Sequence, residues 1–176
     1  MKKYTLFSTL ILASMVSIPT VAADLSGAVG LGLNTGVSVA SDDGETTMSS
    51  GESTDGFTLF GRFGLSKKWG IVASYRKLDG EDAEEYTQIG VHGVITWRSD
   101  RRVRPHFKFG LVHTEMEVPG VSPLSTDAGV GPSIGGGVEI GSQRIAFIGE
   151  LDSTGVQLGD ETRGIANWTA GMVVRF

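Results

Sequence analysis

The chain of 176 residues contains no cysteine, so a scaffold held together by disulfides is excluded. It carries no excess of positive charge either: the net charge is −5, which argues against a general nucleic-acid binder. After the first 23 residues no stretch is apolar enough for a transmembrane helix, which needs about 20 residues. Any membrane-crossing part of the mature chain must therefore belong to a closed β-barrel.

The N-terminus has the pattern of a secretory signal peptide. A basic start and an apolar run over residues 6–18 precede small residues just ahead of Asp24. The apolar run is too short to span a bilayer as a helix. We therefore expect residues 1–23 to be a cleaved signal peptide and residues 24–176 to form a single exported domain.

Eight later segments alternate apolar and polar residues, as strands with two unlike faces do. They cover residues 25–40, 57–66, 70–78, 86–98, 103–118, 130–140, 144–152 and 167–176. A tilted transmembrane strand needs about 9–11 residues, and each of these segments is long enough. The 26 glycines suit bends and close packing in a small barrel. The pattern predicts an all-β fold with an apolar outer face and a polar interior.

The predicted connections alternate in length and in charge. Short ones cover residues 67–69, 99–102 and 141–143, and long ones cover residues 41–56, 79–85, 119–129 and 153–164. Short turns on one side and long loops on the other are typical of outer-membrane barrels. Acidic residues gather in the first two long loops, and basic residues gather at the short turns. We expect the acidic rim to face the outside and the basic rim, with both chain ends, to face the periplasm.

The last segment carries a polar residue, a glycine, an apolar residue and a terminal aromatic residue at Thr169, Gly171, Val174 and Phe176. This spacing resembles the C-terminal signal that is read when bacterial outer-membrane barrels are inserted. With the leader, the eight segments and the alternating connections, the mature chain resembles the small eight-stranded outer-membrane β-barrels of the OmpA transmembrane-domain, OmpX and NspA type.

That resemblance implies an eight-stranded antiparallel up-and-down transmembrane β-barrel in the outer membrane of a Gram-negative bacterium. It implies contact with outer-membrane lipid and lipopolysaccharide, insertion by the barrel-assembly machinery, and a monomer.

Charged residues on the polar faces predict what fills the barrel. An eight-stranded barrel is just wide enough for side chains to occupy its interior, and buried charges must be paired. We expect a salt-bridge network that closes the lumen. Its expected members are Arg62, Arg76, Lys108, Glu139, Arg144, Glu150, Asp152 and Arg175. A narrow ion path is the alternative, whereas a general diffusion porin needs about 16 strands.

Large aromatic residues are expected near the strand ends, where their rings would lie at the lipid headgroups. This predicted girdle comprises Trp69, Tyr75, Tyr86, Trp97 and Trp168, with Phe176 beside it.

No cofactor or metal site is expected. The acidic residues over 79–85 lack the ordered spacing of a calcium loop. The resemblance also extends to lipid A deacylases, which are eight-stranded barrels with a His-x-Ser arrangement and a distant Glu. No histidine in this sequence is part of a His-x-Ser arrangement. Among the histidines, His113 is the best candidate for a catalytic base.

We therefore expect no enzyme, but a role in surface interaction or envelope integrity through the external loops, where an extracellular or host ligand would bind. Two alternatives stay open. A lipid A-modifying barrel enzyme would bring a histidine, a hydroxyl and a carboxylate together on the outer rim. A soluble periplasmic carrier would have an apolar interior and a polar exterior.

Overall fold

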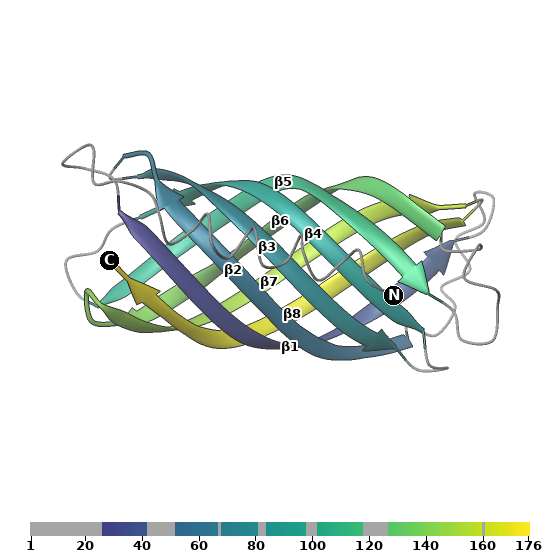
Figure 1. Cartoon of the computed structure of the whole chain (residues 1–176), viewed down its shortest axis with the longest axis horizontal. Helices are drawn as coiled ribbons and strands as arrows, with labels where there is room; N and C mark the ends of the chain where they lie inside the picture. The colour runs from purple at the N-terminus through teal and green to yellow at the C-terminus, as the bar shows by residue number, and fades with distance from the viewer. Residues whose placement is uncertain are drawn as a thin grey trace, which may run out of the picture.

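The computed structural model describes residues 26–41, 52–66, 68–80, 84–97, 102–117, 127–159 and 161–176. Eight antiparallel strands form a closed barrel in which each strand pairs with its neighbours in sequence and the last pairs with the first (Figure 1). They are β1 (Gly27–Ser41), β2 (Glu52–Gly64), β3 (Trp69–Gly80), β4 (Glu85–Thr96), β5 (Val103–Glu117), β6 (Asp127–Gly141), β7 (Ile145–Leu158) and β8 (Glu161–Arg175). The predicted fold class is confirmed. None of the described residues forms a helix long and apolar enough to cross a membrane.

The two-residue alternation of the sequence places apolar side chains on the outside of the barrel. In β5, for example, Phe109 and Leu111 are exposed whereas Lys108 and Val112 are buried. The same arrangement recurs in every strand, and the exposed apolar residues include Leu33, Ile71, Val91, Ile134, Phe147 and Val174. The barrel therefore presents a continuous apolar belt to its surroundings, as a transmembrane barrel does. A soluble carrier with a polar exterior is excluded by this surface.

The two ends of the barrel differ. Residues 65–68, 97–102 and 142–144 connect strands at one end, which we call the turn end. The start of β1 and the end of β8 lie together there, at the left of Figure 1. Gly27 and Phe176 close the seam by exchanging two backbone hydrogen bonds of 3.0 Å. The opposite end, which we call the loop end, carries the connections at residues 42–51, 81–84, 118–126 and 159–160.

The prediction of a long loop at residues 153–164 is wrong. β7 runs to Leu158 and β8 begins at Glu161, so residues 159–160 alone connect them. Gly159 has a φ of +59°, the left-handed conformation that a tight two-residue turn requires. The outward residues Ser153 and Gln157 are polar and the outward Gly155 has no side chain, so this stretch lacks the apolar face by which the other strands were predicted. The expected contrast in connection length therefore holds only for residues 42–51 and 118–126.

A row of glycines lines the inner face of β6. A Cβ atom at Gly135 would lie 2.6 Å from the Cβ of Asp152, and a Cβ at Gly137 would lie 2.8 Å from the Cγ of Glu150. Real side chains do not approach so closely. The missing side chains on β6 thus make the space in which the two acidic side chains of β7 lie inside the barrel.

Candidate functional site

Ionic side chains meet across the middle of the barrel interior. Arg76 on β3 forms a two-pronged contact with Asp152 on β7, with N–O distances of 2.8 and 2.7 Å. Lys108 on β5 lies 3.1 Å from Asp152 and 2.7 Å from Glu150. His106 Nε2 lies 2.6 Å from the other oxygen of Glu150. Two carboxylates and three nitrogen-bearing side chains therefore form one connected network, as buried charges require.

Neutral polar side chains extend this network from β3 along the barrel wall. Arg76 Nε donates to Thr58 Oγ1 at 3.0 Å, and the amide of Asn34 donates to the same oxygen at 2.7 Å. Thr169 Oγ1 donates to Asn34 Oδ1 at 2.5 Å. Side-chain contacts thus run from β7 across the lumen to β3. From β3 they continue through β2 and β1 to β8, the neighbour of β7 in the closed wall. These contacts hold the central side chains in place, although the Nδ1 atom of His106 is buried without a hydrogen-bond partner among the described residues.

Apolar side chains also lie inside the barrel, a feature that the alternation pattern did not predict. One buried cluster comprises Ala28, Phe60, Val72, Val94, Ile148 and Val173. A second, which contains Leu78 and Leu158 from the loop-end parts of β3 and β7, comprises Leu78, Tyr86, Met116, Val156, Leu158 and Ile165. The ring of Phe60 fills the space that a side chain at Gly30, its partner across β1 and β2, would occupy. The interior is therefore ionic in one part and apolar in two others.

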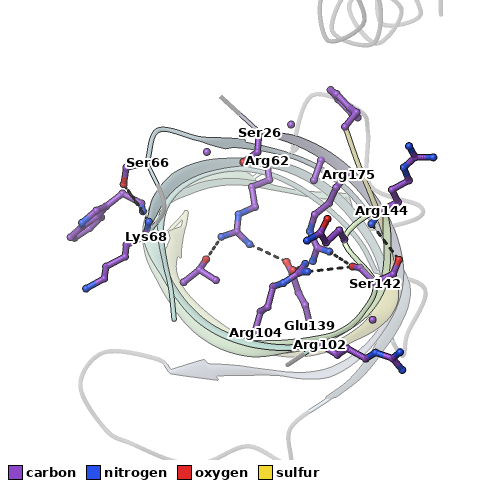
Figure 2. A pocket seen from close by; sticks show the side chains of 18 residues that line it. Ser26, Arg62, Ser66, Lys68, Arg102, Arg104, Glu139, Ser142, Arg144 and Arg175 are labelled. Atoms are coloured by element: carbon purple, nitrogen blue, oxygen red, sulfur yellow. Dashed lines mark hydrogen bonds and ion pairs between the residues drawn. The ribbon is translucent and has the colours of Figure 1, made fainter. Parts of the chain in front are cut away.

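A basic cavity of about 950 Å³ lies at the turn end (Figure 2). Glu139 is its single acidic side chain and is buried. Arg62 Nη1 lies 3.0 Å from Glu139, and Arg175 forms an ion pair with the other carboxylate oxygen. Arg62 also hydrogen-bonds the hydroxyl of Thr96. Arginines from β2 and β8 are thereby joined through one carboxylate on β6.

Of the residues predicted for the lumen network, Arg76, Lys108, Glu139, Glu150 and Asp152 are inside the barrel with the contacts described above. Arg62 and Arg175 lie at the turn-end mouth. Arg144 is different: it is exposed in the turn between β6 and β7. The prediction that Arg144 belongs to the network is wrong, because β7 begins one residue after it and alternation does not apply in the turn. His106 was missed, although it shares the inward face with Lys108.

The residues predicted for the aromatic girdle lie at different places in the barrel. Trp69 and Trp97 are exposed at the turn end. Tyr75 and Trp168 are also exposed, but they lie at the middle of β3 and β8 and not near the strand ends. The prediction for Tyr86 is wrong, because its side chain is fully buried inside the barrel.

Tyr86 belongs instead to a polar cluster at the loop end. Its hydroxyl hydrogen-bonds the carboxylate of Glu84, and Arg163 Nη1 donates to both groups, at 2.9 Å to Glu84 and 2.5 Å to Tyr86. Arg163 also pairs with Glu161 at 3.2 Å. The first residues of β4 and β8 are thus tied together across the barrel mouth.

The four residues of the predicted insertion signal divide between the two faces of β8. Thr169 and Gly171 lie on the inner face, where Thr169 bonds Asn34, whereas Val174 and Phe176 are exposed on the outer face. These positions are those of an ordinary closing strand. Recognition of the four residues during insertion stays a prediction.

His113 lies on the outer face of β5, and its Nε2 is 3.2 Å from a carboxylate oxygen of Glu115. Within the described part of the chain, no hydroxyl forms a hydrogen bond with this histidine. The described residues also contain no group of three or more His, Cys, Asp or Glu side chains arranged to hold a metal ion.

Solved structures with the same architecture are membrane barrels. The Neisserial surface protein A (NspA) has a TM-score of 0.65 and 12% identity, and the alignment covers 85% of this chain and 99% of that one. Ail, the attachment invasion locus protein of Yersinia pestis, has a TM-score of 0.55 and 17% identity over 87% of this chain and 99% of its own. Ail is also known in complex with the heparin analogue sucrose octasulfate. The N-terminal β-barrel domain of Pseudomonas aeruginosa OprF has a TM-score of 0.56 and 13% identity, with 85% and 97% covered.

At these identities the likeness establishes the fold. A comparison with the curated proteins finds no match. The family model described as the outer membrane protein beta-barrel domain matches residues 8–176, nearly the whole sequence. Together with the closed barrel and its apolar belt, this match shows that the chain belongs to the outer membrane protein beta-barrel family and resides in the cell outer membrane.

Proposed function

We propose that the chain is a monomeric, non-enzymatic barrel whose lumen is closed by its own side chains, and that it acts in surface interaction or envelope integrity through its loop end. The packing of side chains inside the barrel is the observation that supports a closed lumen. The central contacts among Arg76, Asp152, Lys108 and Glu150 are flanked by two buried apolar clusters. An ion that entered would have to lose water beside apolar side chains and break paired charges, both of which cost free energy.

Conductance in planar bilayers tests the closed lumen. We expect the purified wild-type barrel to give no reproducible single-channel steps. A variant with Phe60→Ala, Arg76→Ala and Asp152→Ala removes an aromatic ring and the central ion pair together, and we expect it to leak ions. Leu33→Ala, on the outer face, is the matched control and should behave as the wild type. Steps of constant size from the wild-type protein would overturn the closed lumen.

The proposed absence of an enzymatic activity is supported by the surroundings of His113. A hydroxyl nucleophile needs an adjacent base, and the described contact of His113 is with Glu115 alone. Lipopolysaccharide incubated with the detergent-solubilised barrel should show an unchanged lipid A mass. A loss or gain of one acyl chain that disappears in His113→Ala would overturn this part of the proposal.

We propose further that the loop end binds a cationic surface. The sequence places Asp42, Asp43 and Glu45 in the first loop, and Asp79 is exposed near the end of β3. Ail has been solved in complex with the heparin analogue sucrose octasulfate, which is an anionic ligand. The loop-end carboxylates of the present chain would repel such a ligand. Opposite potentials favour association and like potentials oppose it.

Intact cells that display the barrel test this partner chemistry, since only the loop end is then accessible. We expect them to be retained on polylysine surfaces, with less retention at higher salt, and not on heparin surfaces. The triple variant Asp42→Asn, Asp43→Asn and Glu45→Gln should reduce retention on polylysine, whereas the outward-facing substitution Leu33→Ala should not. Stronger retention on heparin than on polylysine would contradict the proposal.

A further inference from the structure

The turn-end cavity holds more positive charge than its own acidic group balances. Six cationic side chains and one acidic side chain, that of Glu139, line it. Arg62, Arg104 and Arg175 point toward the interior around Glu139 (Figure 2). The sequence of the neighbouring turns adds Lys67, Arg98 and Arg101 and one acidic residue, Asp100.

We propose that this cavity is a binding site for a phosphate group. Arginine side chains are planar, stay charged and offer several N–H donors in a fork that matches the oxygens of phosphate. The carboxylate of Glu139 accepts from one nitrogen of Arg62 and from one nitrogen of Arg175. The guanidinium groups of Arg62 and Arg175 each have further N–H groups that can donate to a second anion.

Backbone and side-chain contacts hold the three arginines in place. Arg175 Nη1 and Arg104 Nη2 both donate to the carbonyl oxygen of Ser142, at 3.1 and 3.4 Å. Arg104 and Glu139 are direct partners in the β5–β6 pairing. Arg62 is fixed by Thr96 as well as by Glu139. A site whose donors are already oriented loses less conformational entropy when an anion binds.

The cavity shape agrees with a small phosphorylated ligand. Its volume of about 950 Å³ lies within the range of about 300–1,000 Å³ that is usual for small-molecule sites. A partly enclosed cavity lined by one sign of charge concentrates counter-ions. Lys68, Arg102 and Arg144 point away from the interior at the rim, where they extend the positive field to approaching anions (Figure 2).

Two sources offer this chemistry: a soluble phosphate compound that enters the mouth, and the headgroup of an anionic phospholipid that reaches over the rim beside the apolar belt. Calorimetry with inorganic pyrophosphate, on the whole barrel in a non-ionic detergent, probes the soluble source. Native mass spectrometry with added phosphatidylglycerol or phosphatidylcholine probes the lipid source. Neither measurement depends on whether the lumen is closed, so the two proposals can fail separately.

We expect saturable binding of pyrophosphate, of phosphatidylglycerol, or of both. Arg104→Gln should weaken it at least tenfold, because charge-assisted hydrogen bonds are lost. Arg62→Gln is the second variant, and it tests the same loss of binding if Arg104→Gln does not fold. Lys77→Gln removes the same charge from the outer face of β3 and should change binding less than twofold. Heat-modifiable gel migration verifies that each variant is a folded barrel.

The assignment is overturned if the wild type binds neither ligand saturably. It is also overturned if Lys77→Gln weakens binding as much as the arginine variants do, because binding would then follow net charge and not this cavity. Pyrophosphate binding alone identifies a soluble ligand, and phosphatidylglycerol binding without phosphatidylcholine binding identifies the lipid. Each of these two results, when lost in the arginine variants, supports the site.

Discussion

At the scale of single residues, the stability of the barrel interior depends on pairs of buried side chains. Asp152 accepts from Arg76 and lies against Lys108, and its side chain fits because Gly135 has none. Removing one partner of a buried ion pair leaves an uncompensated charge, which costs more than the pair itself contributes. Substitutions inside this barrel should therefore have large effects that depend on the partner.

Asp152→Asn is the direct test of this coupling. We expect it to lower the free energy of unfolding by about 3–5 kcal/mol, because Arg76 loses its anionic partner and Lys108 loses one of two. Urea unfolding in lipid vesicles measures the change. Asp55→Asn, exposed on β2, is the control and should have an effect of about 1 kcal/mol or less. Equal effects of the two substitutions would show that the central pair contributes no special stability.

Gly30→Val tests the packing of Phe60. A side chain at residue 30 would enter the space of the Phe60 ring, and such overpacking costs about 1–3 kcal/mol. Gly149→Val is the matched control, because a Cβ there has open space around it. The midpoint of urea unfolding should fall for Gly30→Val and stay nearly constant for Gly149→Val. The reverse order would contradict the described packing.

At the scale of the elements, β8 has two separable roles. Its backbone closes the barrel against β1 and β7, and its last residues are predicted to be read during insertion. Phe176 contributes to both, since it exchanges two hydrogen bonds with Gly27 and projects from the outer face.

Deleting Phe176 should lower the amount of heat-modifiable barrel in the outer membrane of cells. The purified truncated chain should still refold in detergent, because the remaining residues of β8 keep their pairing with β1. Gel migration with and without boiling measures both. Normal levels in cells would argue against the insertion signal, and failure to refold in detergent would assign the defect to barrel closure instead.

Element by element, the sequence predicted the strands whose outward residues are apolar and missed the parts where they are not. The number of strands and the outward position of their apolar residues were correct, because alternation has a period of two throughout the apolar belt. The extension of β7 over residues 153–158 was missed because its outward residues are small or polar. The Gly159-Asp160 pair was itself a hairpin signal that could have placed the turn.

The candidate site was less predictable than the fold. The inward charges at Arg76, Lys108 and Glu150 follow from alternation alone, whereas their pairing across the lumen depends on strand tilt and registration, which one sequence does not contain. Inward apolar residues such as Leu78 and Ile165 were missed because hydrophobicity marked the outer face. The exposed position of Arg144 depended on where β7 begins, a matter of one residue.

At the scale of the whole molecule, the apolar belt fixes the barrel in the bilayer. A charged side chain at mid-belt must lose its hydration, whereas one beyond the belt keeps it. Leu111→Arg, in the central part of β5, should therefore destabilise the folded barrel by about 2–4 kcal/mol.

Refolding into vesicles at graded urea concentrations measures this cost. Gln157→Arg is the control: it lies on the outer face near the loop end of β7, outside the apolar belt, and should change the unfolding free energy by about 0–1 kcal/mol. Similar costs at the two positions would mean that the belt does not coincide with the membrane core.

The bare inner face of β6 has a consequence for how this sequence can vary over time. A Cβ at Gly137 would also lie 2.2 Å from the backbone oxygen of Gly149, and one at Gly135 would lie 2.8 Å from that of Leu151, so exchange of the facing carboxylates would not make room for a side chain. Descendants of this chain should therefore keep glycine at both positions, even where Asp152 and Glu150 are exchanged.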